Sequence, residues 1–262
     1  MPRLQPPSKE DSQLLPPYVA LPDSAIYIPA SDAAFAYARE QLLSQTALGF
    51  DTESKPIFHT AQIDTGPHVV QLATPTAAWL LQLHHPQALA LAREVIAHPG
   101  ICKVGFGLDN DKSTLPQRLG VQLENILDLD RLFKRYGYGA STGVRAAVAL
   151  VLGQNFHKSK KQSTSNWSLP RLSDAQVRYA ANDAHAPAMV YAALPAWQAQ
   201  QPEPNAPRPL QHSSEAKPSA TRKRPTSNHQ TETPRSANPK PRQRAYLLQR
   251  APNKTQNPSE DS

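Results

Sequence analysis

Hydrophobic and polar positions alternate in strand-like and helix-like patterns between residues 25 and 198. Short apolar runs bounded by turn residues predict strands, and apolar positions that recur every three or four residues predict helices. The predicted strands are 25–28, 48–53, 68–73, 77–83, 102–106 and 126–129, and the predicted helices are 31–43, 86–97, 142–152, 173–199 and one that ends near residue 119. An antiparallel hairpin followed by strand–helix alternation predicts an α/β fold, in which helices flank both faces of a mixed sheet.

Composition predicts one folded domain between two segments of different character. Residues 1–22, with two Pro-Pro pairs, are expected to form an irregular leader, and residues 23–198 the domain. Residues 199–262 are expected to form a disordered, basic, proline-rich tail, because few large apolar side chains there can offset the entropy of ordering. From residue 198 onward the chain has 11 Lys and Arg against 5 Asp and Glu, so most of its net charge of +7 lies in this tail. Such a tail is consistent with a polyanionic partner, or with a solvated segment that binds nothing.

The cysteine content and the absence of long apolar runs bear on location. The single cysteine, Cys102, cannot form a disulfide within the chain, which favours a reducing compartment. No run in the sequence resembles a signal peptide or is long enough to span a bilayer. We therefore expect a cytoplasmic protein with no membrane partner, and the sequence identifies no protein partner.

The first group of acidic residues stands at the end of an apolar strand. Asp51 and Glu53 are two positions apart, so their side chains project from the same face of the strand. Two neighbouring carboxylates stay ionised only beside positive charge, which a divalent cation with oxygen ligands supplies. The alternative is a pair of solvated acids at a strand end.

Two further groups follow later in the chain. Asp109 and Asp111 follow a glycine-containing turn near the start of a helix, where ordinary N-capping is the alternative explanation. Tyr179 and Asp183 are four positions apart in the last helix, so that the phenol and the carboxylate share one face. Taken alone, this last pair is equally typical of a core tyrosine beside a surface acid.

The order, spacing and local sequence of the three groups resemble the DEDDy class of 3′→5′ exonucleases. The resemblance covers about residues 25–198 and is carried by 49–56 (GFDTESKP), 103–111 (KVGFGLDND) and 165–183 (SNWSLPRLSDAQVRYAAND). It points to ribonuclease D-like and Werner-type exonuclease domains, and so implies a ribonuclease H-like fold. The related DEDDh class has a histidine five residues before the final aspartate, where this chain has Arg178.

The resemblance also implies roles for individual residues. Asp51 would bridge two divalent cations, Glu53 and Asp183 would hold the cation that activates water, and Asp111 the cation at the leaving group. Tyr179 would orient the attacking water, since a phenol with a pKa of about 10 is a poor anionic base at neutral pH. Mg²⁺ or Mn²⁺ suits an all-carboxylate site.

The second motif leaves an alternative open. Asp111 fits the register of the family motif better than Asp109, but the sequence does not decide between them.

Five lysines near these motifs are candidates for contacting substrate phosphates. Lys55 and Lys112 stand beside acidic motif residues, and Lys158, Lys160 and Lys161 belong to a basic segment that precedes the third motif. For the basic segment, a solvated loop is the alternative.

The resemblance implies hydrolysis of nucleic acid from a free 3′ end. DNA is favoured over RNA, because ribonuclease D proteins usually continue into helical nucleic-acid-binding domains, whereas this chain continues into the proline-rich tail. RNA trimming of the ribonuclease D type is the alternative. A catalytically inactive nucleic-acid-binding module is disfavoured, because every acidic position of the motifs is filled.

Overall fold

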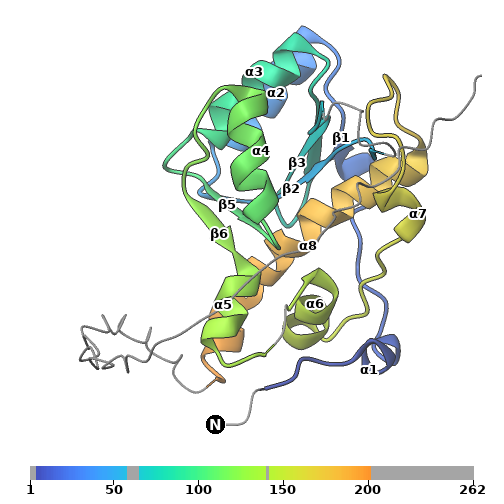
Figure 1. Ribbon diagram of the computed structural model, residues 1–262, viewed down its shortest axis with the longest axis vertical. Helices are drawn as coiled ribbons and strands as arrows, with labels where there is room; N and C mark the ends of the chain where they lie inside the picture. The colour runs from blue at the N-terminus through green and yellow to red at the C-terminus, as the bar shows by residue number, and fades with distance from the viewer. Residues whose placement is uncertain (1–3, 58–64, 140–141, 202–262) are drawn as a thin grey trace, which may run out of the picture. The chain divides into compact units, whose positions relative to one another are not determined.

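The computed structural model describes residues 4–57, 65–139 and 142–201 (Figure 1). Six strands form one mixed sheet in the order β1-β4-β3-β2-β5-β6. The strands are β1 Ile26–Tyr27, β2 Ala47–Glu53, β3 Val69–Ala73, β4 Ala78–Gln82, β5 Cys102–Gly105 and β6 Ile126–Asp128. Strands β2, β3 and β4 pair antiparallel, whereas β1 joins β4 in parallel and β5 and β6 continue in parallel from β2. The predicted α/β fold with a mixed sheet is confirmed.

Helices cover both faces of this sheet (Figure 1). They are α1 Lys9–Gln13, α2 Asp32–Leu43, α3 Pro86–Ile96, α4 Asp109–Leu119, α5 Leu129–Arg135, α6 Val144–Leu152, α7 Lys160–Ser163 and α8 Asp174–Gln198, with a 3₁₀ turn at Asp23–Ala25. Helices α2, α3 and α4 share one hydrophobic cluster with the sheet. Helix α8 packs on β2 and β3, and α6 packs on α8.

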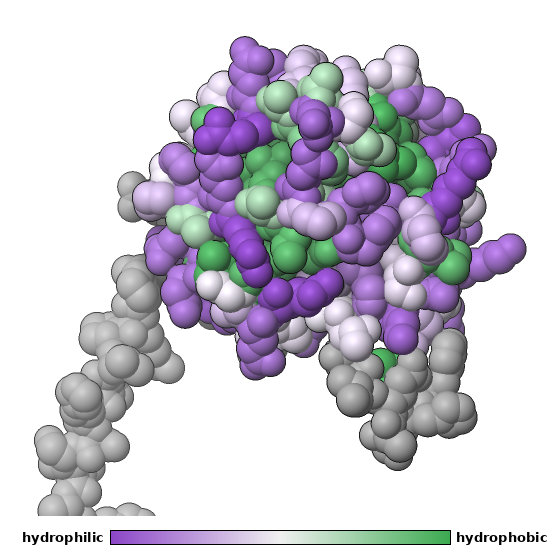
Figure 2. Space-filling model, turned by 90° about the horizontal axis from the view of Figure 1, so that it is seen from above, coloured by the Kyte–Doolittle hydropathy of each residue, from purple (hydrophilic) through white to green (hydrophobic). Residues whose placement is uncertain are grey.

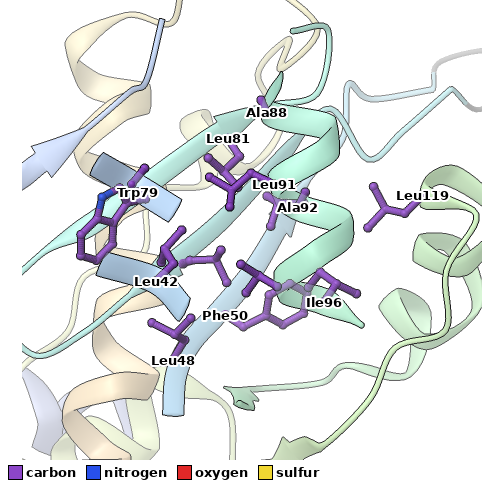
Figure 3. Packing of buried hydrophobic residues seen from close by; sticks show 14 of the residues in the cluster. Leu42, Leu48, Phe50, Trp79, Leu81, Ala88, Leu91, Ala92, Ile96 and Leu119 are labelled. Carbon is purple, nitrogen blue, oxygen red and sulfur yellow. The ribbon is translucent and has the colours of Figure 1, made fainter. Parts of the chain in front are cut away.

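The central strand β2 contacts the helices on both sides of the sheet, because its alternate residues face opposite sides. Leu48 and Phe50 belong to the cluster of α2 and α3. Figure 3 shows Phe50 among Leu42 of α2 and Leu91 and Ile96 of α3, all fully or almost fully buried. The opposite face of β2 carries Gly49, Asp51 and Glu53 and is turned to α8. The same alternation that buries the aromatic ring therefore presents the two acids to the last helix.

Helix α8 approaches β2 unusually closely. A Cβ atom added at Gly49 would lie 2.0 Å from the Ala184 carbonyl oxygen and 2.8 Å from the Ala188 backbone nitrogen. Buried alanines on this side of α8, including Ala180 and Ala181, leave the space that such contact needs. Small residues on both elements thus bring the backbone of α8 against the strand that carries the acids.

The N-terminal segment differs from its predicted irregular course. Helix α1 forms within residues 1–22 and packs against α6. Its start has a capping box, in which the Ser8 hydroxyl accepts from the Asp11 backbone and the Asp11 carboxylate accepts from the Ser8 backbone. The sequence pattern Ser-x-x-Asp signals this helix start, but the helix is too short to show hydrophobic periodicity.

Two other short helices, α5 and α7, were absent from the predicted elements. Of the predicted disordered tail, 199–262, only residues 199–201 lie within the described part of the chain.

Hydrophilic residues dominate the face shown in Figure 2, and hydrophobic residues show between them in smaller areas. Within the described ranges, no helix combines the length and the apolar character needed to cross a bilayer.

Candidate active site

Acidic side chains from three elements meet at the end of β2. Asp51 and Glu53 project from β2 toward α8, and Asp183 on α8 is 3% exposed. Burial raises the pKa of both strand carboxyl groups, and the nearby charge of Asp183 raises it further. The predicted grouping of the first and third motifs is therefore present in the structure.

Asp111 reaches the same strand from the opposite side of the sheet. The Thr52 hydroxyl donates a hydrogen bond to Asp111 Oδ1 at 2.5 Å, and Asp111 is 8% exposed. Asp109, by contrast, has a side chain that is 69% exposed and pairs with Arg131 and Lys112. Burial raises the pKa of Asp111. Its position beside β2 supports Asp111, rather than Asp109, as the acid of the second motif.

Asp128 was not among the predicted site residues, yet it fixes the turn that leads to Asp111. Its carboxylate accepts hydrogen bonds from the backbone nitrogens of Gly107 and Leu108, each at 3.2 Å. Gly107 has a φ of +67°, a conformation that favours glycine. The sequence offered only an aspartate within a predicted strand, and in the structure Asp128 is also the N-cap of α5, where its side chain accepts from the Asp130 backbone nitrogen.

Lys158 lies among the carboxylates. Its Nζ is 2.9 Å from Asp183 Oδ2 and 4.0 Å from Asp51 Oδ2, and it stands 5.7 Å from the centre of the Tyr179 ring. Burial opposes the charged form of Lys158, but the two aspartates outweigh burial and raise its pKa above the usual range. The sequence predicted a phosphate-binding lysine at this position, and the structure adds its direct contact with the acids.

Burial and mutual repulsion raise the pKa values of these carboxyl groups. Burial, then Asp183, raises the pKa of Asp51 to about 8, against the opposing charge of Lys158. Burial, Asp51 and Asp183 raise the pKa of Glu53 to about 9. The pKa of Asp183 is raised as well, because burial outweighs the effect of Lys158. One ammonium group is too little positive charge for these acids, so the site favours additional cations.

The start of α8 holds Tyr179 in place. Gln176 completes a capping box with Ser173 and also donates to the Ser165 hydroxyl and the Asn166 carbonyl. The Trp167 ring is buried 6.0 Å from the Tyr179 ring, which supports the packing role expected of a large aromatic side chain. Gln176 is a positioning residue that the sequence indicated only as part of the third motif.

The Tyr179 hydroxyl is buried and makes no well-formed hydrogen bond with the described residues, although it lies close enough to Asp183 for the two groups to interact. Burial and the nearby Asp183 raise the pKa of Tyr179 above its ordinary value, so the phenol is neutral at physiological pH. A neutral hydroxyl beside the acids suits the predicted role of orienting a water molecule.

The other predicted lysines lie around the site rather than in it. Lys112 pairs with Asp109 at 3.6 Å, and Lys160 and Lys161 stand exposed on α7. The backbone nitrogen of Lys55 donates to His68 Nδ1 at 3.2 Å. These positions leave their predicted phosphate contacts as predictions.

The donor set fits divalent cations of the magnesium type. All four acids offer carboxylate oxygens, which Mg²⁺ and Mn²⁺ prefer. Asp183 Oδ2 is buried and, although close to Lys158, makes no well-formed hydrogen bond with the described residues. In the described part of the chain, no three of these carboxylates lie close enough together to hold one metal ion as they stand. The lysine and the threonine instead satisfy part of their charge.

Known proteins resemble this chain over the region that holds the site. The model of the 3′-5′ exonuclease family matches residues 27–196. The bifunctional 3′-5′ exonuclease/ATP-dependent helicase WRN of Mus musculus is 27% identical over 186 residues, covering 68% of this chain and 13% of that protein. A 3′-5′ exonuclease of Arabidopsis thaliana is 26% identical over 152 residues, covering 56% of this chain and 52% of that protein. The chain thus spans about half or less of the length of these two relatives.

Solved structures show the same fold. The EXO domain of Aedes aegypti Nibbler superposes with a TM-score of 0.58 at 23% identity, covering 69% of this chain and 92% of that one. Ribonuclease D of Escherichia coli superposes with a TM-score of 0.55 at 20% identity, covering 66% of this chain and 45% of that one. The likeness confirms the predicted ribonuclease H-like fold. With the match of the family model across residues 27–196, it follows that the chain belongs to the 3′-5′ exonuclease family of phosphodiester hydrolases.

Proposed function

We propose that this chain hydrolyses nucleic acid from a free 3′ end, with two Mg²⁺ or Mn²⁺ ions held by Asp51, Glu53, Asp111 and Asp183. One observation carries the proposal: Asp51 of β2 and Asp183 of α8 lie beside a single ammonium group, Glu53 and Asp111 lie next to them on β2 and α4, and the pKa values of all four acids are raised. Such an arrangement is costly for a structural role, because like charges are held together out of water. It is useful where cations must be bound.

The bound cations would supply a nucleophile at neutral pH and stabilise the charge on the attacking and leaving oxygens. The protein contributes the rest. Tyr179 offers a neutral hydroxyl that orients the attacking water. Lys158 offers an ammonium group beside the acids that attracts an oxygen of the scissile phosphate. Helix α8 and strand β2, packed backbone to backbone, hold Tyr179 and the acids in fixed positions, and Lys158 reaches them from the segment before α7.

DNA is the substrate that we propose first, and RNA of the same sequence is the alternative. A competition assay tests this choice, with DNA and RNA oligonucleotides of one sequence mixed in one reaction with Mn²⁺. Faster shortening of the DNA supports the proposal. Faster shortening of the RNA replaces it with RNA trimming.

Tyr179→Phe is expected to lower activity without lowering stability. Loss of the hydroxyl should lower turnover about 10- to 100-fold, because the water loses a group that orients it. The melting temperature should change little, because the buried hydroxyl that is removed makes no well-formed hydrogen bond with the described residues. Steady-state kinetics and thermal unfolding of the same sample measure both. A lower melting temperature together with unchanged turnover would assign the hydroxyl a structural role instead.

The raised carboxyl pKa values predict how stability depends on pH. A carboxyl group whose pKa is higher in the folded state stabilises the fold at low pH and loses this contribution as the pH rises through the folded value. With EDTA present, the melting temperature should therefore fall between about pH 5 and pH 9, because Asp51 and Glu53 have pKa values of about 8 and about 9. Mn²⁺ should raise the melting temperature by roughly 5 °C or more near pH 8 and less at pH 5, because protons compete with the cation.

Asp51→Asn is the control for this pH dependence. It removes one titrating acid and relieves Glu53, so its melting profile in EDTA should be flatter, and Mn²⁺ should stabilise it less. Profiles that coincide for the wild type and Asp51→Asn would show that these acids are not strained in the absence of cations.

A further inference from the structure

We propose that a basic pocket beside the carboxylates binds phosphate groups of the nucleic-acid strand; this inference rests on the proposed function. The pocket has a volume of about 270 Å³. Three separate parts of the chain line it, with Lys9 and Gln13 from α1, Arg145 from α6, and Asn155, His157 and Lys158 from the segment before α7. It is called the α1–α6 pocket below.

The lining of the α1–α6 pocket has the chemistry of a phosphate site. It holds three basic side chains, Lys9, Arg145 and Lys158, of which Lys158 is paired with Asp183, and no acidic residue. Phosphodiester oxygens are bound in proteins by lysine, arginine and side-chain amides of this kind. Lys9 and Arg145 are exposed and form no ion pair with any described residue, so their charges are available to a ligand.

Lys158 connects this pocket to the candidate active site. It is one of the residues that line the pocket, and its Nζ lies 2.9 Å from Asp183 Oδ2. For a strand whose terminal phosphodiester lies at the carboxylates, we place a neighbouring phosphate in the pocket that Lys158 shares with Lys9 and Arg145. The two residues would bind the strand without touching the reacting atoms.

Hydrogen bonds fix the N-terminal segment, which forms one side of the α1–α6 pocket. The Tyr18 backbone nitrogen donates to the Asn155 carbonyl at 3.0 Å, and the Asn155 nitrogen donates to the Pro16 carbonyl at 2.8 Å. The Tyr18 hydroxyl contacts His185 Nδ1 at 2.7 Å, while His185 Nε2 lies 3.0 Å from the Pro75 carbonyl. Because a carbonyl only accepts, Nε2 of the neutral imidazole donates and Nδ1 accepts from the tyrosine. These bonds tie the residues after α1 to the segment that carries Lys158.

Helix α1 lies outside residues 27–196, the region that the family model matches. The contribution of Lys9 is therefore an addition of this chain to the matched domain, whereas Arg145 and Lys158 lie inside it.

Binding of a short single-stranded oligonucleotide to the full chain in EDTA tests the α1–α6 pocket directly. The variants are Lys9→Gln, Arg145→Gln and the double variant, and Arg135→Gln is the charge-matched control, since Arg135 ends α5 and does not line the pocket. Kd is measured by fluorescence anisotropy at salt concentrations between about 50 and 200 mM.

Each pocket variant should weaken binding about 3- to 10-fold at low salt. The slope of log K against log salt should become shallower by about 0.7 for each lost phosphate contact, and so by about 1.4 in the double variant. Arg135→Gln should change neither quantity to this extent. The inference is overturned if the double variant keeps the wild-type slope, if Arg135→Gln has the same effect as Arg145→Gln, or if the wild type binds no oligonucleotide.

A small substrate separates this inference from the proposed function. Thymidine 5′-(4-nitrophenyl phosphate) offers a phosphodiester but no strand, so its hydrolysis with Mn²⁺ reports on the carboxylates alone. The double variant should hydrolyse it as the wild type does and lose only the binding of the oligonucleotide. Absence of hydrolysis in the wild type would count against the proposed function, while the binding data would still decide on the pocket.

Discussion

Asp51→Asn and Asp183→Asn are each expected to lower the turnover of nucleic acid about a thousandfold, equivalent to about 4 kcal/mol of transition-state stabilisation. Both acids border the ammonium group of Lys158, and we assign the half-buried carboxylate of Asp51 and the buried carboxylate of Asp183 as ligands of divalent cations. An amide has nearly the same shape but no charge, so the fold should persist while the affinity for cations falls. Single-turnover rates with Mn²⁺ and a thermal melt of each variant measure the two effects.

Asp109→Asn is the matched control, because it makes the same chemical change two residues from Asp111. Asp109 lies at the surface with Arg131, so its variant should keep turnover within about threefold of the wild type. Asp111→Asn should instead lose about a hundredfold or more. Near-normal turnover of Asp51→Asn or Asp183→Asn would refute the assignment of the ligands, and equal losses in the Asp109 and Asp111 variants would refute the choice between them.

Gly49→Ala is expected to destabilise the fold by about 3 kcal/mol. The added methyl group would lie 2.0 Å from the Ala184 carbonyl oxygen, and the contact is with backbone that cannot rotate away. Helix α8 would have to move off β2, which also separates Asp183 from Asp51. Urea unfolding should show a lower midpoint with an unchanged slope, and the remaining folded protein should bind Mn²⁺ less tightly.

Gly143→Ala provides the comparison for this effect. Gly143 precedes α6 with ordinary backbone angles, and an added Cβ would meet no atom within 4 Å. The substitution should change stability by about 1 kcal/mol or less. Equal unfolding midpoints for the two variants would mean that the close contact of α8 with β2 is not a source of stability.

The long elements were predictable because each carries enough periodic positions to show its type. The helix predicted at 86–97 is observed at Pro86–Ile96, and the strand predicted at 48–53 at Ala47–Glu53. Helices α1 and α7 were not predicted, because helices of four or five residues carry no period. The capping box at Ser8 was the available signal for α1.

The acidic groups of the site were predictable where spacing within one element sets the geometry. Asp51 with Glu53 and Tyr179 with Asp183 follow from the periods of strand and helix. Asp109 and Asp111 differ by about 200° around a helix, so only the packing of α4 shows which one turns to β2. The contact of Lys158 with Asp183 joins a loop to a helix, and no local pattern encodes it.

A time course on end-labelled oligonucleotides tests the central claim most directly. DNA and RNA, labelled at either the 5′ or the 3′ end, are incubated with Mg²⁺, Mn²⁺ or EDTA. The account predicts stepwise shortening of the 5′-labelled strands and immediate release of labelled mononucleotide from the 3′-labelled strands, in both cases only with a divalent cation. Binding without cleavage under every metal condition, or cleavage that persists in EDTA, would contradict it.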